Sequence, residues 1–313
     1  MALLAAALLL AWVLDAAFGE PRNALHPVAW LGNLLGPLGR GLLRLPPAAA
    51  FLGGALVWLM LALSFAVAAW GWQRLALDWP AWLAVPALAL VLKPMFAWRM
   101  LRDEVSAVEQ ALAQGVLPAR EQLARLVSRD VSQFDESALR ETAIETLAEN
   151  LNDSLVAPLF WFAVAGLPGA VVYRFANTAD AMWGYRGRWE WAGKWAARAD
   201  DVLSWLPARL TGLALAPLRL WPQLPSLARC TPSPNGGWPM GAMALRLGVR
   251  LRKPGVYALN ASAPSPGAGH MLQALQTAGR VATATVVAAV VAAVVMAAAT
   301  CWLQGLCATG AAR

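Results

Sequence analysis

The sequence predicts an all-α, polytopic integral membrane protein. Of its 313 residues, 59% are hydrophobic and only 14% are charged, whereas soluble domains carry about a quarter charged residues. Long uncharged stretches alternate with short basic segments, which is typical of a chain that crosses a bilayer repeatedly. We therefore expect a single membrane domain over residues 1–313, with about five or six membrane segments and a helical insertion on the cytoplasmic side.

The apolar segments are expected in a definite order along the chain. Residues 1–18 lack any basic residue and so do not resemble a cleaved signal peptide. They form a first helix in which Asp15 faces protein or water, because a carboxylate is costly in lipid. Further spans are predicted at residues 48–73, 79–98 and 281–303. Lys93 is expected to snorkel to the interface, and residues 202–221 form a weaker apolar segment.

Two stretches of the chain are polar. Residues 99–153 are predicted to be a helical cytoplasmic-side insertion, whose last helix has Asp135 as its N-cap. Residues 222–280 are predicted to be a Pro/Gly-rich basic loop region. The basic residues of both stretches place them in the cytoplasm. Residues 154–173 stay ambiguous, because their length allows a span while two prolines and two glycines favour a re-entrant or broken helix.

Composition also excludes several kinds of site. The chain has three cysteines and two histidines, and Cys230, Cys301 and Cys307 form no C-x-x-C pair, so neither a disulfide framework nor a zinc site is expected. Neither a P-loop nor a dinucleotide-binding glycine motif occurs. The net charge of +7 fits basic cytoplasmic loops better than nucleic-acid binding, so we predict no nucleic-acid partner.

The most unusual polar feature is a row of carboxylates that leads into an apolar segment. In a helix, Glu141, Glu145, Glu149 and Asp153 recur every four residues and share one face. Like charges at that spacing destabilise a helix, so for an isolated row a solvated face is the ordinary interpretation. The alternative is a bound cation, since Mg²⁺ takes a few carboxylates together with substrate phosphates. The motifs that follow favour the cation.

Three further polar blocks stand at the edges of apolar segments, at residues 173–186, 197–209 and 233–239. They place Arg and Asp side by side, which is expensive near lipid and marks function. Together with Gly19-Glu20-Pro21, His26-Pro27, Ser128-Arg129-Asp130 and the glutamate row, they resemble the adenosylcobinamide-phosphate synthase family of cobalamin biosynthesis (CobD/CbiB). The resemblance covers nearly the whole chain. The departures are Glu20 where the family usually has Asp, Val131 where Thr is common, and Met240, which weakens a metal-binding role for its loop.

The resemblance implies an enzyme, a carbon–nitrogen ligase that uses ATP and Mg²⁺. It would couple a propionate carboxylate of adenosylcobyric acid to aminopropanol or its phosphate, giving adenosylcobinamide or its phosphate. The implied partners are the corrinoid and aminopropanol phosphate substrates, membrane lipid and other late cobalamin-pathway membrane enzymes. The implied location is the bacterial inner membrane, as a multi-pass protein.

Phosphoryl transfer requires Mg²⁺ held by carboxylates and cations around the phosphates, and the expected site residues follow from that requirement. The catalytic candidates are Glu145, Glu149 and Asp180. The metal-ligand candidates are Glu145, Glu149, Asp153, Asp200 and Asp201. The substrate- and phosphate-binding candidates are Arg129, Arg174, Asn177, Arg186, Arg209 and Asn235. The open alternatives are a snorkelling anchor for each Arg, a helix N-cap before Val202 for Asp200 and Asp201, and a turn residue or substrate contact for His26.

Two other classes of function compete with the enzyme. A non-catalytic sensor or scaffold, similar to the AmpE-like membrane signalling proteins, would share the organisation but would not need the full set of Arg, Asp and Glu side chains. A corrinoid or ion transporter would place its charges near the middle of the bilayer, whereas these stand at the ends of segments. We therefore expect the enzyme.

Overall fold

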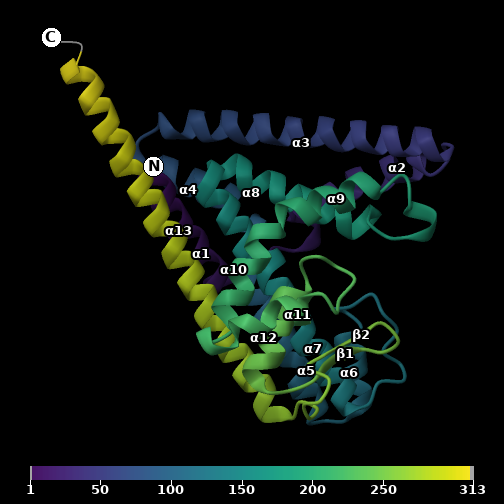
Figure 1. Cartoon of the computed structure of the whole chain (residues 1–313). Helices are drawn as coiled ribbons and strands as arrows, with labels where there is room; N and C mark the ends of the chain where they lie inside the picture. Colours follow the sequence, from purple (N-terminus) through teal and green to yellow (C-terminus); the bar gives the residue numbers. More distant parts are fainter. Residues whose placement is uncertain (1, 311–313) are drawn as a thin grey trace. The chain divides into compact units, whose positions relative to one another are not determined.

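The computed structural model describes residues 2–310, and these residues are almost entirely helical (Figure 1). They form two compact units, each assembled from separate stretches of the chain. The first unit takes the chain up to Phe96, residues Pro158–Trp195 and the chain from Ala284 onward. The second unit takes Ala97–Ala157 and Ala196–Thr283. The single membrane domain expected over residues 1–313 stays a prediction.

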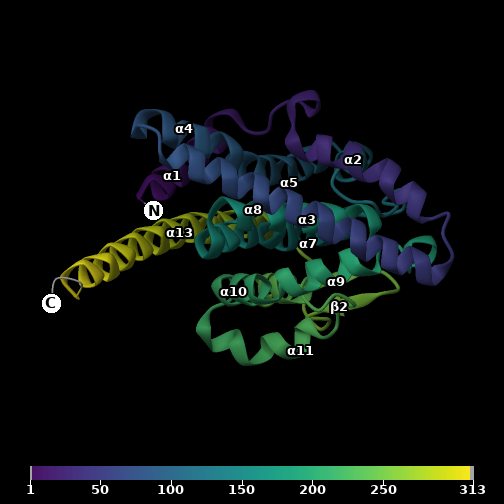
Figure 2. The same ribbon diagram turned by 90° about the horizontal axis from the view of Figure 1, so that it is seen from above.

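The first unit is built of apolar helices. Its helices are α1 (Ala2–Phe18), α2 (Pro27–Leu42), α3 (Pro47–Leu77), α4 (Ala81–Leu92), α8 (Ala157–Trp183) and the second part of α13 (Ala268–Gly310), with short 3-10 turns at Asn23–Leu25, Lys93–Met95 and Gly187–Trp189. Helix α1 packs on α4. Helix α3 runs along α8 (Figure 2), where the rings of Trp58 and Phe65 both lie 5.5 Å from that of Phe175.

Four helical stretches of the described chain are long and apolar enough to cross a membrane. They are Pro47–Leu77, Ala81–Leu112, Glu136–Trp183 and Ala268–Met296. Helix α1 is apolar but shorter, with 17 residues. These stretches overlap the spans expected at residues 48–73, 79–98 and 281–303. The prediction of an all-α, polytopic membrane protein is confirmed.

The ambiguous segment at residues 154–173 is a broken helix. Gly166 inside α8 has a φ of 66° and a ψ of −152°, values that a residue with a Cβ rarely adopts. A Cβ on Gly169 would collide with the carbonyl oxygen of Trp161, although residues eight apart in a straight helix are separated by about 12 Å. The chain therefore turns back on itself at Gly166. The side chain of Gln73 in α3 accepts a hydrogen bond from the Leu167 N–H at 2.7 Å, which satisfies a donor that the break leaves free.

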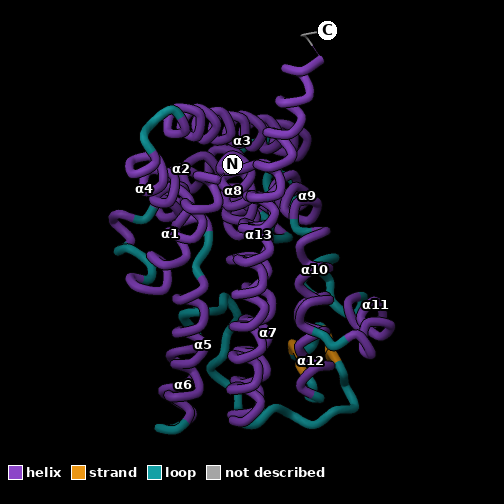
Figure 3. The backbone as a smooth tube through the Cα atoms, turned by 90° about the vertical axis from the view of Figure 1, so that its left-hand side faces the viewer, coloured by secondary structure: helices purple, strands orange, loops and turns teal. Residues whose placement is uncertain are grey.

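The second unit is a bundle of shorter helices with one hairpin. Its elements are α5 (Trp98–Leu112), α6 (Val116–Leu123), α7 (Glu136–Leu151), a π-helix (Asn152–Val156), α9 (Lys194–Leu203), α10 (Trp205–Leu215), a 3-10 helix (Leu218–Gln223), α11 (Leu224–Ala228), α12 (Gly237–Leu247), β1 (Leu251–Lys253), β2 (Tyr257–Leu259) and the first part of α13. Helix α7 lies between α5 and α12, and α12 packs on α10 (Figure 3). Helix α7 is therefore the central helix of the second unit.

The region at residues 222–280 holds more regular structure than its composition suggests. It contains α11, α12 and the antiparallel pair β1–β2, in which Leu251 faces Leu259. Gly248 ends α12 in the left-handed conformation, which glycine adopts readily at the end of a helix. Cys230 is a free, exposed cysteine. The side chains of Cys301 and Cys307 lie outside the described ones, so the expectation that the chain has no disulfide framework stays a prediction.

Candidate active site

Helix α7 carries the carboxylate row through the interior of the second unit. The Asp135 side chain caps it by accepting a hydrogen bond from the Ala138 N–H at 2.7 Å, as predicted. Every residue from Leu139 to Ala148 is buried. Glu141 is 0% exposed and Glu145 is 1% exposed, so these two glutamates do not form a solvated face. Carboxylates buried in this way need partners, and the partners differ along the row.

Glu141 is neutralised by two guanidinium groups. Arg250 donates to its Oε1 at 3.2 Å, and the Nε of Arg252 lies 3.2 Å from its Oε2. The hydroxyl of Ser137 donates to Oε1 at 3.4 Å. Because both arginines belong to the chain around β1, this ion-pair cluster fastens the hairpin to α7. Glu141 is therefore a structural member of the row.

Glu145 is only partly compensated. Arg129 donates to its Oε2 at 3.3 Å, while its buried Oε1 has no hydrogen-bond partner among the described residues. Tyr257 of β2 lies near Glu145 and Glu149, and its hydroxyl stays protonated. Burial raises the pKa of Tyr257, and these two carboxylates raise it further. Glu145 thus forms one ion pair, with Arg129, and lies beside the protonated hydroxyl of Tyr257.

Glu149 stands one turn further along and forms no ion pair with a described residue. It interacts with Asp153 and Glu145, which repel it, and with Arg129 and Lys253, which attract it. Beyond it the helix widens into the π-helix Asn152–Val156, a deformation often found at functional sites. The carboxylate of Asp153 accepts a hydrogen bond from the Asn152 amide at 2.8 Å.

Contacts with arginine thus decline along the row, from two at Glu141 to one at Glu145 and none at Glu149 within the described chain. The negative charge left at the far end lies beside the loop that contains Gly236. A Cβ built on Gly236 would stand 2.8 Å from Glu149 Oε1. The arrangement suits a cationic ligand held at Glu145 and Glu149.

Arg209 and Asn235 lie together next to that loop. The Arg209 guanidinium packs over the rings of Trp205 and Trp238, 4.4 and 5.0 Å from their centroids. It donates to Asn235 Oδ1 at 2.6 Å, and the Asn235 amide donates to the Asp201 carbonyl at 2.8 Å. Since Gly236 follows Asn235, these contacts fix the loop that approaches Glu149.

Asp200 and Asp201 are not helix caps. They lie inside α9, which begins at Lys194, so the alternative of an N-cap before Val202 is wrong. The helix starts earlier because Lys194 and the alanines that follow are good helix formers. Burial raises the pKa of Asp201, against the opposing effect of Arg198, whose guanidinium lies 3.7 Å away.

The site suits Mg²⁺ only when substrate phosphates supply some of the ligands. Among the side chains that the structure describes, no group of three His, Cys, Asp or Glu residues is arranged to hold a metal ion, so the predicted ligands do not form a preformed cage. Mg²⁺ is usually bound through one or two carboxylates plus substrate phosphates. The partnerless Oε1 of Glu145 and the unpaired Glu149 are suited to that mode. The assignment of Glu145, Glu149, Asp153, Asp200 and Asp201 as metal ligands stays a prediction.

The close approach of Gly236 to Glu149 gives a direct test of the site. Substitution Gly236→Ala is expected to displace the Glu149 carboxylate, since its Cβ would press on Oε1, and to reduce turnover at least about tenfold, or about 1.4 kcal/mol. The fold should survive because Gly236 has a φ of −57°. Steady-state rates and melting temperatures measure the two effects.

Gly269→Ala is the control for Gly236→Ala, because no atom lies within 4 Å of its added Cβ. Equal activity of both variants would show that the position of Glu149 does not matter to the reaction.

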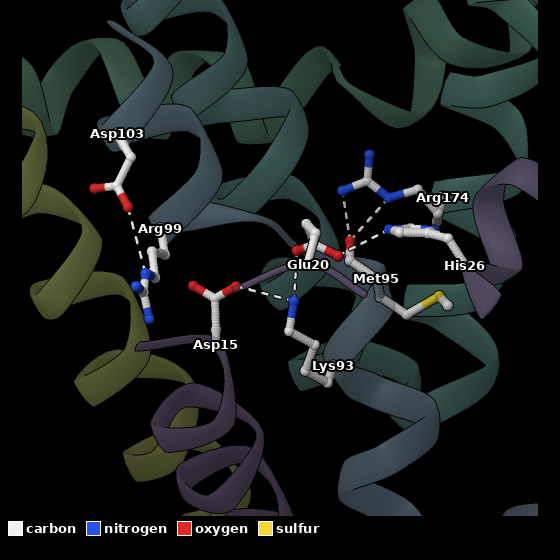
Figure 4. Close-up of polar contacts among 8 residues, drawn as sticks. All are labelled: Asp15, Glu20, His26, Lys93, Met95, Arg99, Asp103 and Arg174. Atoms are coloured by element: carbon white, nitrogen blue, oxygen red, sulfur yellow. Dashed lines mark hydrogen bonds and ion pairs between the residues drawn. The ribbon is translucent and has the colours of Figure 1, made fainter. Parts of the chain in front are cut away.

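A second cluster of charges lies in the first unit, around Lys93 (Figure 4). Its ammonium group is 3.2 Å from Asp15 and 2.5 Å from Glu20. Lys93 is 7% exposed and Asp15 is 1% exposed, so the prediction that Lys93 snorkels to the interface is wrong, while the expectation that Asp15 faces protein is confirmed. The ion pairs connect α1, the loop after it and the end of α4.

His26 completes this cluster in the first unit. Its Nε2 lies 2.8 Å from Glu20, and its Nδ1 accepts a hydrogen bond from the Val28 N–H at 3.1 Å. His26 is therefore the N-cap of α2, which agrees with the turn-residue alternative. Burial raises the pKa of Glu20, but hydrogen bonds from His26 and Lys93 outweigh that effect and leave it below its ordinary value.

The remaining predicted residues belong to α8 and the loop after it. Arg174 donates twice to the Met95 carbonyl, at 2.9 and 2.5 Å (Figure 4), and contacts Asn177 Oδ1 at 3.5 Å. Arg174 and Asn177 thus share a helix face, as expected, while Arg186 is exposed after the helix end. All of these residues lie in the first unit, so a pocket shared by Asp180 with Glu145 or Glu149 stays a prediction.

Asp180 is expected to be functional rather than structural. Asp180→Asn should abolish most activity and weaken Mg²⁺ or nucleotide binding with little change in melting temperature, since an exposed ion pair would contribute at most about 1 kcal/mol. Turnover and the Mg²⁺ dependence of the rate measure this. Asp103→Asn is the matched control, because Asp103 forms exposed pairs with Arg99 and Arg102. Full activity of Asp180→Asn would show that Asp180 has only a structural role, such as an ion pair near the end of α8.

The site contains residues that the sequence did not single out for it. In the sequence, Arg250 and Arg252 resemble ordinary basic residues of a loop, and no motif marks Tyr257. The available signal was the basic run Arg250–Lys253 followed by a tyrosine, but a basic run in a membrane protein is ordinarily a topological signal. Only the hairpin shows that these side chains point at α7.

Comparisons with known proteins agree on one family. The sequence model described as CobD/Cbib protein matches residues 8–282. A protein of Thermococcus kodakarensis named "Probable cobalamin biosynthesis protein CobD" is 43% identical over 253 residues, 80% of this chain and 82% of the relative. The "Cobalamin biosynthesis protein CobD" of Rhodobacter capsulatus is 40% identical over 287 residues, 84% of this chain and 88% of the relative. No solved structure was found to match the chain.

Proposed function

The chain belongs to the CobD/CbiB family, and from that premise we propose that it is an ATP-dependent carbon–nitrogen ligase of cobalamin biosynthesis. The reaction would join adenosylcobyric acid to aminopropanol phosphate, or to aminopropanol, through an amide bond. A carboxylate oxygen of the corrinoid would attack the terminal phosphorus of ATP and release ADP. The amine would then displace phosphate from the acyl carbon and lose a proton. The sensor or scaffold alternative is not favoured, because the matching relatives are named for cobalamin biosynthesis.

The observation that carries the proposal is the graded neutralisation of the α7 row. Glu141 forms ion pairs with Arg250 and Arg252, Glu145 forms one with Arg129, and Glu149 forms none with a described residue. Bound Mg²⁺ would supply the positive charge that screens the phosphates during transfer. Glu145 and Glu149 would hold that charge in place, and Arg129 would neutralise the oxygens around it, since guanidinium groups match phosphate oxygens in pairs. Either carboxylate, when not so engaged, would accept the proton of the amine.

Reconstitution of the reaction tests the proposal. Purified protein would receive adenosylcobyric acid, ATP and Mg²⁺ with either aminopropanol or its phosphate, and the products would be followed by mass spectrometry. The expected result is one amide product with stoichiometric ADP and phosphate. Formation of AMP and pyrophosphate would reject phosphoryl activation, and turnover without ATP would reject the ligase assignment. Comparison of the two amines identifies the phosphorylation state of the substrate.

The location proposed for the protein is the bacterial inner membrane. Residues 99–153 and 223–280 are expected to lie in the cytoplasm because of their basic residues. Cysteines introduced at Gln110 and Ser262 on a cysteine-free background should react with a membrane-impermeant reagent only after the cells are opened. Labelling of both positions in intact cells would reverse the predicted topology.

A further inference from the structure

Helix α10 and its flanks present an apolar surface on the outside of the second unit. Its inner face, including Ala208, Thr211 and Leu215, is buried. The outer side, called here the α10 face, consists of large apolar side chains that are between 37% and 73% exposed: Val202, Trp205, Leu206, Leu210, Leu218 and Trp221. A helix apolar on both sides requires a second apolar environment for its outer face.

The α10 face is too short to belong to a span. Helix α10 has 11 residues, which extend about 16 Å, while the hydrocarbon core of a bilayer is about 30 Å thick. The four candidate spans among the described residues do not include it. Proline residues at both ends of the following turn, Pro217 and Pro222, prevent its continuation as one helix. The predicted weak segment at residues 202–221 therefore does not cross the membrane as a helix.

A cationic pocket adjoins the α10 face. It has a volume of about 510 Å³ and is lined by Arg198, Arg209 and Arg229, together with Ser233 and Trp238. Arg209 connects the two features, because it packs over Trp205 of the face and also lines the pocket. Its hydrogen bonds go to the neutral oxygens of Trp205, Pro234 and Asn235.

The charge around the pocket is mainly positive. Arg198 lies 3.7 Å from the Asp201 carboxylate, whereas Arg209 and Arg229 form no ion pair with a described residue, and the sequence contains no Asp or Glu after Asp201. Burial lowers the pKa of Arg209, which is the effect expected of a guanidinium group withdrawn from water without a compensating anion. A phosphate in the pocket would provide that anion.

We propose that the α10 face lies flat in the interfacial layer of an anionic bilayer, with the phosphate of a phospholipid in the pocket of Arg198, Arg209 and Arg229. The apolar side chains enter the acyl boundary, as in interfacial amphipathic helices, and Trp205 and Trp221 lie at headgroup level. An anionic phospholipid combines an apolar chain with a phosphate, and the surface offers a place for both. A soluble phosphate compound would fill the pocket alone, and a second copy of these residues would bring no acidic side chain.

Depth measurements on the full chain in nanodiscs test the orientation. Spin labels at Val202, Leu206 and Leu210 should all show the same shallow depth, with high exposure to oxygen and low exposure to a water-soluble nickel complex. A transverse helix would instead change depth by about 12 Å between the first and last label, and that result would overturn the proposal. Labels shielded from both reagents would show a protein partner, including a second copy, in place of lipid. A label at Leu117, which is 70% exposed on α6, is the water-facing control.

Lipid retention tests the pocket. Wild-type protein extracted from membranes that contain phosphatidylglycerol should retain this lipid in native mass spectrometry, and Arg198→Gln/Arg229→Gln should retain it several-fold less. The control Arg44→Gln, in the first unit, should behave as wild type. Displacement of the lipid by millimolar inorganic phosphate, or equal retention by the double variant, would overturn the assignment. Arg229 is not among the predicted active-site residues and forms no ion pair with a described residue, so ligase turnover of Arg229→Gln alone should match wild type, which separates this test from that of the proposed function.

Discussion

Glu145→Gln and Glu149→Gln are expected to abolish turnover, each by at least about 100-fold, as the removal of one charge-stabilising group does in other active sites. Each variant keeps the shape of the side chain and removes only its charge. Glu145 has a buried oxygen without a partner among the described residues, and Glu149 forms no ion pair there. The charge of Glu149 is therefore not required by any ion pair of the described fold, and its removal should leave the melting temperature unchanged or raise it, because buried charge costs stability. Glu145→Gln also removes the ion pair with Arg129, and because that arginine is partly exposed to water, the melting temperature should fall only slightly.

The matched controls are Glu136→Gln and Glu141→Gln, which change the same chemical group on the same helix. Glu136 pairs with Arg140 near the surface, so its loss should affect neither rate nor stability appreciably. Glu141→Gln should instead lower stability, because it leaves Arg250 and Arg252 without their buried partner. Full activity in both Glu145→Gln and Glu149→Gln would reject the carboxylate row as a catalytic site. Insertion and folding of each variant would be checked by size-exclusion chromatography.

Lys93→Met is expected to destabilise the first unit by about 3–5 kcal/mol, the usual cost of removing one partner from a buried ion pair. It removes the buried cation that lies 3.2 Å from Asp15 and 2.5 Å from Glu20. The triple variant Asp15→Asn/Glu20→Gln/Lys93→Met also removes the two carboxylate charges and should regain most of the stability. Thermal unfolding in detergent measures both variants. Lys194→Met is the control, since Lys194 and Glu190 form a pair that is over one-third exposed.

The same cluster has a predictable dependence on pH. The folded-state pKa of Glu20 is lowered from 4.5, so its ion pairs contribute fully above that value and are lost as the pH falls through the folded-state pKa. The melting temperature of the wild type should therefore fall on acidification below 4.5, and that of the triple variant should fall less. If the melting temperatures of the wild type and the triple variant fall equally on acidification, Glu20 does not control acid stability. If Lys93→Met is as stable as the wild type, the ion pairs of Lys93 do not stabilise the first unit.

The sequence predicted the helices well and the partners of their charges poorly. The N-cap Asp135 predicted the start of α7, and the spacing of four residues predicted that Glu141, Glu145 and Glu149 share one face. Capping and periodicity are local properties of a helix, so the sequence alone reveals them. The burial of that face was not predictable, since α7 is surrounded by helices and a hairpin from elsewhere in the chain. The division of the row into a paired and an unpaired end depends on Arg250 and Arg252, which lie 109 or more residues away.

Long-range pairing also explains the error at Lys93. In isolation, a lysine followed by proline near the end of an apolar segment is most simply satisfied by reaching the interface. Its partner Glu20 stands 73 residues earlier, in a loop whose path no local pattern specifies. The relation of Asp200 and Asp201 to α9 was missed for a different reason. A pair of aspartates before an apolar segment is typical of a helix N-cap. Only the position at which α9 begins, Lys194, shows that Asp200 and Asp201 lie inside the helix.

The turn at Gly166 constrains how this chain can enter a membrane during synthesis. The N–H of Leu167, freed by the turn, would cost several kcal/mol in hydrocarbon without an acceptor. Its acceptor is the side chain of Gln73, made 94 residues earlier on α3. The two halves of α8, before and after Gly166, are therefore compatible with lipid only when they lie beside α3. That helix has already left the ribosome when α8 is made. The order of the segments along the gene therefore suits assembly, because α3 is already made when α8 needs the acceptor that Gln73 provides.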